Sequence, residues 1–281
     1  MSTAVSIVVA CTGGDEMLSG CLESLEAQRG DAEVIAVGAW DAPSRGRLSQ
    51  RFPWVTLLEA EEGTSVFVRR ARGLARSRGQ RLMLLEDHCR AAPGWLQALT
   101  TAGQTAAGGP VRGDSAPSWR AFALYLVEYS ALMPPLADGP CPALLAVNAA
   151  YGREALFAVT DAWREAFYDN EVHDALRASG HPTHAVAAAV VDSRLDLALK
   201  AACAHLFAGG RRFGGRCDNR TLRFLAAPIL PLVLLGRILS RVARRRPSWL
   251  ARTLLAVPLM LLLLAAWSAG EALGALAHRR S

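Results

Sequence analysis

The first hundred residues alternate short apolar runs with amphipathic segments, and few folds accommodate that alternation. Apolar residues at helical spacing predict helices over 17–25 and 66–75. Strands that alternate with helices form parallel sheets with right-handed crossovers, and strands that are apolar throughout are covered on both faces. We therefore expect an α/β fold in which helices flank a mostly parallel sheet. The predicted strands are residues 5–10, 34–37, 55–58 and 82–85.

The middle of the chain predicts further helices around a loop. Residues 103–118 are rich in Gly, Pro and Ser and are expected to form a loop, with a short strand near residue 108. Helices are predicted over 119–133 and around 152–180. The helix that begins at Val66 is expected to carry five arginines on its outer face: Arg69, Arg70, Arg72, Arg76 and Arg78.

The fourth apolar run ends abruptly in two carboxylates and an imidazole, Glu86, Asp87 and His88. Ligand sites gather at strand ends along the edge of an α/β sheet. Side chains of these types, side by side, can hold a hard divalent cation, and such a cation can hold a phosphate. The alternative is a strand that simply exits into solvent with polar residues.

The carboxyl-terminal sixty residues are far more apolar than the rest. Residues 224–236 form one apolar run, interrupted by two prolines, and residues 254–270 form a second run of 17 residues. A spanning helix needs about 20 residues. We therefore expect 224–240 to be in-plane or re-entrant, and 250–277 to be transmembrane or interfacial. Two core helices of a soluble protein are the alternative, which the scarcity of polar residues over 254–267 disfavours.

Positive charge accumulates in the same region. After residue 205, 13 arginines face only two acids, Asp218 and Glu271, so this part carries +11 while the whole chain carries +6. The arginines flank apolar runs rather than exposed aromatic residues. The pattern therefore favours an anionic membrane surface as partner and argues against a nucleic acid.

Two further features concern the cellular compartment. Six cysteines are scattered without CxxC or metal-finger spacing, which is typical of reduced thiols in the cytosol. The chain runs straight into the apolar residues 5–10 without a basic segment, so we interpret its start as a core strand rather than a signal peptide.

Several segments carry recognisable motifs in a fixed order. They are the strand 5–10, the helix 21–28, residues 71–79 before the fourth strand, Glu86-Asp87-His88, Pro93-Gly94-Trp95-Leu96, and residues 148–156 and 168–180. In this order, and over nearly the whole chain, they resemble the family 2 glycosyltransferases of the GT-A fold. The resemblance implies a Rossmann-like sheet. Residues 267–271 also resemble membrane segments of bacterial members.

The resemblance implies a nucleotide-sugar site with a divalent metal. Glu86 aligns with the first acid of the family's DxD motif, and His88 aligns with its metal ligand. His88 and Glu86 are therefore the predicted ligands of Mn²⁺ or Mg²⁺, with imidazole favouring Mn²⁺. Asp87 is the runner-up ligand. The predicted nucleotide-sugar-binding residues are Ala10, Asp41, Arg72, Glu86 and Asp87.

The later motifs imply the catalytic and acceptor residues. Asp169 is the predicted general base, which removes the acceptor's proton. His173 lies four residues on and would share a helical face with Asp169, so we expect it to orient the acceptor or tune the base. Asn148 and Arg153 are predicted to bind the acceptor. A solvated helix face is the alternative for Asp169 and His173.

Three departures from the family pattern support a second hypothesis. The family's DxD motif reads Glu86-Asp87-His88 in this chain. Its Asp-Gly-Ser turn is replaced by residues 38–41, so only the displaced Asp41 can serve as the turn's nucleotide contact. The family's acidic pair at the base is Tyr168-Asp169, so one acid is missing. The alternative function is therefore a non-catalytic membrane scaffold with a degenerate nucleotide-sugar site.

Together these features predict a GT-A domain over 1–220 and a membrane-associated helical hairpin over 221–281. The expected activity is that of an inverting, metal-dependent, hexosyltransferase-like enzyme that acts on a hydroxyl acceptor, either lipid-linked or a cell-envelope polysaccharide. Its expected location is the cytoplasmic face of the cell inner membrane. The expected partners are the donor, membrane lipids and the lipid-linked acceptor, and an oligomer is compatible with the sequence.

Overall fold

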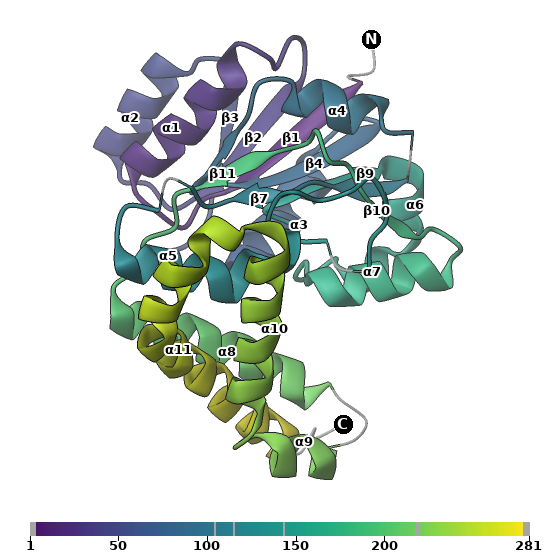
Figure 1. Ribbon diagram of the computed structural model, residues 1–281. Helices are drawn as coiled ribbons and strands as arrows, with labels where there is room; N and C mark the ends of the chain where they lie inside the picture. The colour runs from purple at the N-terminus through teal and green to yellow at the C-terminus, as the bar shows by residue number, and fades with distance from the viewer. Residues whose placement is uncertain (1–3, 104, 115, 143, 217–219, 278–281) are drawn as a thin grey trace. The chain divides into compact units, whose positions relative to one another are not determined.

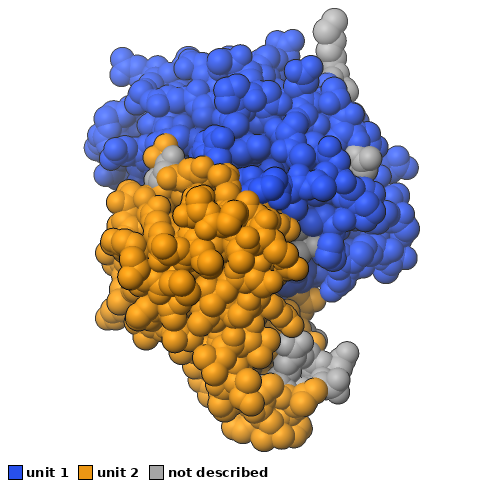
Figure 2. All heavy atoms as spheres, in the orientation of Figure 1, with its two compact units in different colours: residues 1–112, 134–193 blue, residues 113–133, 194–281 orange. Residues whose placement is uncertain are grey.

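The structure, a computed structural model, describes residues 4–103, 105–114, 116–142, 144–216 and 220–277. The chain divides into two compact units (Figure 2). Unit 1 is Met1–Arg112 with Pro134–Ser193, and unit 2 is Gly113–Met133 with Arg194–Ser281. Unit 2 therefore combines a segment from the middle of the chain with the carboxyl-terminal part. The predicted domain boundary at residue 220 stays a prediction.

Among the described residues, unit 1 contains an eight-stranded sheet of order β3-β2-β1-β4-β9-β6-β10-β8. Its parallel half is made of the four predicted strands (Figure 1), and β9 pairs antiparallel with both β4 and β6. A smaller sheet has the order β5-β11-β7. The strands are β1 (Val5–Ala10), β2 (Glu33–Gly38), β3 (Val55–Glu59), β4 (Arg81–Glu86), β5 (Cys89–Ala91), β6 (Ala106–Gly108), β7 (Val111–Arg112), β8 (Gly139–Pro140), β9 (Asn148–Gly152), β10 (Thr183–Ala185) and β11 (Val191–Ser193).

Helices cover the sheet of unit 1 and bury its apolar side chains. Val8, Ile35 and Leu84 belong to one core cluster with Leu74 of α3 and Leu176 of α7. The helix α2, which the sequence did not predict, buries only Leu48 and so has no apolar stripe. The helical elements are α1 (Asp15–Glu26), α2 (Ala42–Arg51), α3 (Val66–Arg76), α4 (Trp95–Thr101), α6 (Arg153–Ala158), the 3₁₀ turn Thr160–Ala162 and α7 (Asp169–Ala178).

The order of the parallel strands creates a switch point between β1 and β4. From β1 the chain adds β2 and β3 on one side, and then returns to place β4 on the other side of β1. Right-handed crossovers therefore put α1 and α2 on one face of the sheet and α3 on the opposite face. Ala10 and Glu86 are register partners at the carboxyl ends of β1 and β4. Ligand crevices in α/β sheets form at such a point.

Unit 2 is helical. Its elements are α5 (Trp119–Tyr129), the 3₁₀ turn Ser130–Leu132, α8 (Leu199–Gly215), α9 (Arg220–Ala226), α10 (Leu230–Arg245), the 3₁₀ turn Pro247–Trp249 and α11 (Leu250–Leu276). Within the described ranges, the helical stretch Pro247–Leu276 is the one segment long and apolar enough to cross a membrane, with a mean hydropathy of 2.0. No disulfide joins the cysteines that the structure describes, and Cys217 lies outside the described residues.

Candidate active site

The polar residues that follow β4 are buried. Glu86, Asp87 and His88 are 7%, 0% and 2% exposed. Charged side chains are rarely so buried unless they are paired. The alternative of a strand that exits into solvent is therefore wrong, and the partners of these three residues determine what the site can do.

Asp87 ties the end of β4 to the loop that follows β1. Its Oδ2 accepts hydrogen bonds from the backbone N–H groups of Thr12 (2.7 Å) and Gly13 (2.6 Å). Its own N–H donates to the carbonyl oxygen of Ala10 at 3.3 Å. Burial raises the pKa of Asp87, while the neighbouring His88 and the N–H group of Gly13 act in the opposite direction. The structure thus brings Ala10 and Asp87 together, both predicted to bind the donor.

Arg70 of α3 links the end of β4 to the predicted base. Its Nη2 donates to Glu86 Oε1, and its Nη1 lies 3.5 Å from Asp169 Oδ2. The guanidinium group is buried and lies over the ring of Phe67, 5.3 Å from its centroid. One cation therefore holds two carboxylates that are distant in the sequence, and sequence reasoning missed this residue.

The prediction that all five arginines near α3 lie on its outer face is wrong for Arg69 and Arg70. Both are buried, because acceptors at the strand ends neutralise or bind their guanidinium groups: Arg69 donates to the carbonyl oxygen of Cys11. Arg72, the predicted nucleotide contact, is exposed. The signal that points to Arg70 is its spacing, because it lies three residues after Phe67 and four before Leu74.

Asp169 is the first residue of α7 and is partly accessible, with 17% of its side chain exposed. Its Oδ1 accepts the backbone N–H of Ala146 at 2.9 Å. A carboxylate is favoured at a helix amino terminus by the helix dipole. Asp169 therefore combines a fixed position beside Arg70 with access to solvent, as a proton acceptor requires.

His173 lies on the same helix, one turn after Asp169, but it is only 1% exposed. Its Nε2 is 2.8 Å from the Tyr151 hydroxyl, and the two rings stack. Burial lowers the pKa of His173, and the nearby Asp169 partly offsets this effect. This environment suits a neutral side chain that packs α7 against Tyr151 in the core. Direct contact of His173 with an acceptor would require its hydrogen bond with Tyr151 to break.

The predicted acceptor residues lie at opposite ends of β9. Asn148 pairs with Leu85, next to the site, but is fully buried: Nδ2 donates to the carbonyl oxygens of Pro110 and Ala189, and Oδ1 accepts from Trp95 Nε1 at 2.7 Å. Acceptor binding by Asn148 would break these bonds. Arg153 follows Gly152, which pairs with the first residue of β4, so it lies at the other edge of the sheet from Glu86.

Asp41, the predicted substitute for the family's turn acid, caps α2. It is exposed, and its Oδ1 accepts the backbone N–H of Ser44 at 2.7 Å. This hydrogen bond lowers the pKa of Asp41. The structure does not bring Asp41 into contact with the residues that follow β4.

The end of β4 offers donors that suit a divalent cation. Glu86 Oε2 and His88 Nδ1 are 3.5 Å apart, and a carboxylate with an imidazole beside it is a donor pair that would hold a divalent ion. Asp87 Oδ1 is buried and accepts no hydrogen bond within the described part of the chain. No three His, Cys, Asp or Glu side chains converge on one point among the described residues. A cation held by Glu86 and His88 would therefore need further ligands from another molecule.

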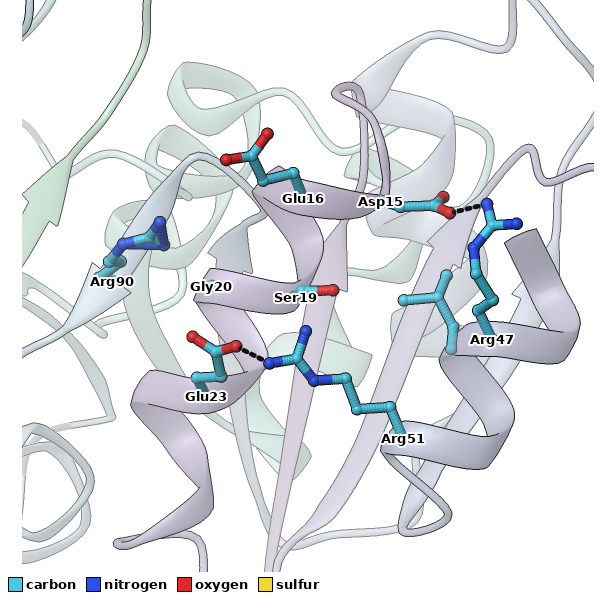
Figure 3. Close-up of a pocket in the computed structure, with 9 residues that line it drawn as sticks. Asp15, Glu16, Ser19, Gly20, Glu23, Arg47, Arg51 and Arg90 are labelled. Carbon is cyan, nitrogen blue, oxygen red and sulfur yellow. Dashed lines mark hydrogen bonds and ion pairs between the residues drawn. The ribbon is translucent and has the colours of Figure 1, made fainter. Parts of the chain in front are cut away.

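A cavity of about 490 Å³ lies elsewhere in unit 1, between α1 and α2 (Figure 3). Figure 3 shows Arg47 directed at Asp15 and Arg51 at Glu23, and both are ion pairs. None of the predicted site residues lines it. Because the charged side chains on its wall are paired with one another, we do not consider this cavity a second candidate active site.

The fold is similar to those of solved glycosyltransferases. GalNAc-T7, crystallised with UDP, GalNAc and Mn²⁺, matches with a TM-score of 0.53 and 15% identity over 70% of this chain. The mannosyltransferase PcManGT from Pyrobaculum calidifontis, in complex with GDP-Man and Mn²⁺, matches with a TM-score of 0.50 and 16% identity over 98% of this chain and 74% of its own. This confirms the predicted GT-A-type α/β fold.

The likeness is one of fold. The chain spans only 44% of the length of GalNAc-T7. No protein-family model and no curated protein matches the sequence. Membership in family 2 and a bacterial origin therefore stay predictions.

Proposed function

We propose that this protein is a metal-dependent glycosyltransferase that moves a hexosyl group from a nucleotide-diphosphate donor to a hydroxyl acceptor with inversion. The observation that carries the proposal is the buried cluster at the switch point of a GT-A-like sheet. There, Arg70 joins Glu86 at the end of β4 to Asp169 at the start of α7. Two similar structures hold a nucleotide or nucleotide sugar with Mn²⁺.

Each side chain has a role in this proposal. Glu86 and His88 would hold the divalent ion, which would offset negative charge on the departing nucleoside diphosphate. Asp87 fixes the loop after β1, where the backbone N–H groups of Thr12 and Gly13 are already engaged by its carboxylate. Asp169 accepts the proton of the attacking hydroxyl. Arg70 holds both carboxylates in place.

We also propose that the enzyme works at the cytoplasmic face of the inner membrane on a lipid-linked or cell-envelope acceptor. The support is the apolar helix α11 together with the net charge of +11 after residue 205. An anionic leaflet attracts basic segments by about 1 kcal/mol per Arg near the surface.

The second candidate is a membrane scaffold with a degenerate nucleotide-sugar site. It is favoured by the capping role of Asp41, whose carboxylate is engaged in α2 rather than directed at a nucleotide. It also agrees with the missing acid at Tyr168.

One experiment separates the two candidates. Purified, detergent-solubilised protein is incubated with UDP-, GDP- and dTDP-sugars and Mn²⁺ or Mg²⁺, and nucleotide release is measured for wild type and His88→Ala. We expect metal-dependent release from one donor, lost in the variant. Absence of both release and nucleotide binding with either metal would favour the scaffold.

A further inference from the structure

All the large apolar side chains that are exposed in the described residues belong to unit 2. They lie on α5, on α9, at the start of α10 and on α11. Those on α11 are Leu254, Leu255, Leu262, Leu273 and Leu276. A monomer in water rarely exposes so many large apolar groups on one unit, so this surface indicates a partner.

The exposed positions of α11 form a continuous stripe. From Ala251 to Leu276 they recur every three or four residues and contain only Ala, Leu and Pro258. At 1.5 Å per residue the stripe is about 39 Å long. Three polar side chains of this helix, Thr253, Ser268 and Glu271, are buried. A water-facing helix has the reverse arrangement.

Tight packing joins the last turns of α11 to α8. Gly270 and Gly274 of α11 face the carbonyl oxygens of Phe207 and Arg211, and a Cβ at either glycine would overlap them. In return, Gly210 and Gly214 of α8 face the carbonyl oxygens of Trp267 and Glu271 in the same way. The two helices therefore run parallel at backbone contact, and α11 is not a separate anchor.

Charged groups of unit 2 lie beside the start and the last turns of α11. Arg211 and Arg212 of α8 are exposed beside its last turns. Near its start, Arg252 lies over Phe122 of α5, 3.9 Å from the ring centroid, and α5 carries Arg120 paired with Asp196 at 2.9 Å. α8 and α5 carry these groups and pack against α11, so both helices would have to enter the bilayer with a crossing α11, and charged side chains are unfavourable in hydrocarbon.

We propose that unit 2 docks on an anionic lipid bilayer with the stripe of α11 lying in the plane of one leaflet, so that α11 does not cross the membrane. Exposure on α11 is confined to this stripe, so the stripe is the face that would enter the boundary between headgroups and acyl chains. The net charge of +11 after residue 205 complements anionic headgroups. This inference rests on the membrane association proposed above.

The arginines of α10, with Arg246 directly after it, divide into exposed side chains and side chains that bind protein. Arg237 and Arg244 are exposed and are available to headgroups. In contrast, Arg241 donates to Ser130 Oγ at 3.2 Å, and Arg245 donates to the carbonyl oxygen of Ala131 at 2.9 Å. Arg246 pairs with Asp114 at 3.5 Å. These three hold unit 2 together rather than serving the membrane.

The test is flotation of the full chain with vesicles of equal parts phosphatidylcholine and phosphatidylglycerol. The variants are Leu255→Glu, Leu262→Glu and Leu273→Glu, near the start, middle and end of the stripe. Gln50→Glu on α2 is the matched control, since Gln50 is exposed and belongs to unit 1. In-plane docking predicts that each stripe variant loses about tenfold or more in vesicle affinity, and that the control binds like wild type.

The outcomes separate association from orientation. A loss confined to Leu262→Glu would overturn in-plane docking, because a spanning helix tolerates charge near its ends far better than at its centre. Failure of wild type to float would overturn the membrane association itself. If wild type then formed a dimer that Leu262→Glu dissociates, the stripe would be a protein interface. Circular dichroism of each variant verifies that it is folded.

Discussion

The end of β4 and the surface of α11 depart from ordinary burial in opposite directions. Near the end of β4, the side chains of Arg70, Glu86, Asp87 and His88 are buried, whereas α11 exposes leucines to solvent. Buried charges lower the free energy of unfolding unless they are paired, and exposed apolar stripes promote association. The proposed function would account for both regions, with a charged ligand at the end of β4 and an apolar membrane surface at α11.

The largest expected effect concerns the first region. If Asp169 is the general base, Asp169→Asn should lower the transfer rate by about 10²- to 10⁴-fold, because Asn accepts no proton but retains the bond from the N–H of Ala146. The rate of donor consumption with acceptor present measures this. Asp161→Asn is the control, since Asp161 has 96% of its side chain exposed. Equal rates in the two variants would remove Asp169 from the mechanism.

The second prediction tests whether buried charge is structural as well as chemical. Arg70→Ala leaves Glu86 buried without its cation, so the free energy of unfolding should fall by about 3–5 kcal/mol. Arg72→Ala, on the exposed face of the same helix, should change it by less than about 0.5 kcal/mol. Urea unfolding at neutral pH measures both. Similar effects of the two substitutions would contradict the buried position of Arg70.

The third prediction sharpens the description of unit 2. Gly214→Ala places a methyl group against the carbonyl oxygen of Glu271 and should destabilise the protein by about 1–3 kcal/mol. Gly236→Ala, in open space on α10, should stabilise it by about 0.5–1 kcal/mol, because alanine is the better helix former. Thermal unfolding should therefore shift in opposite directions. A neutral Gly214→Ala would show that α8 and α11 are not in backbone contact.

The smallest effect is a pH dependence in unit 1. Burial lowers the pKa of His173 below the ordinary histidine value of 6.5. Between these two pKa values the unfolded chain therefore binds a proton that the folded chain does not. The free energy of unfolding should then be fully retained above pH 6.5 and fall as the pH drops below it. His173→Gln should weaken this dependence. Urea unfolding at several pH values compares the slopes, and unchanged slopes would contradict a buried, neutral His173.

The sequence predicts the parallel half of the sheet well because its strands are long and apolar. The strands β5, β8, β10 and β11 have two or three residues each, too few for any periodicity to be visible. The helix α2 is not predicted for a related reason: Leu48 is its single buried residue, so the helix has no apolar stripe.

The candidate site divides in the same way. Glu86, Asp87 and His88 could be found because an apolar run ends in them. The spacing of Arg70 indicates its face of the helix but does not identify its partners, since Glu86 and Asp169 are 16 and 99 residues away. Arg153 shows the limit of motif order: a motif does not reveal that β9 is antiparallel to β4, which sends the residue after it to the far edge of the sheet.

The contribution of α5 to unit 2 has a practical consequence for anyone who wants a more soluble form of the protein. Cutting the chain at residue 220 would not excise an anchor, because α5 lies in the middle of the sequence and would lose the cover of its aromatic face. Phe122 and Tyr125 contact Trp249, at 5.5 and 6.1 Å between ring centroids. Substituting the exposed leucines of α11 with polar residues is therefore a better route to solubility than truncating the chain.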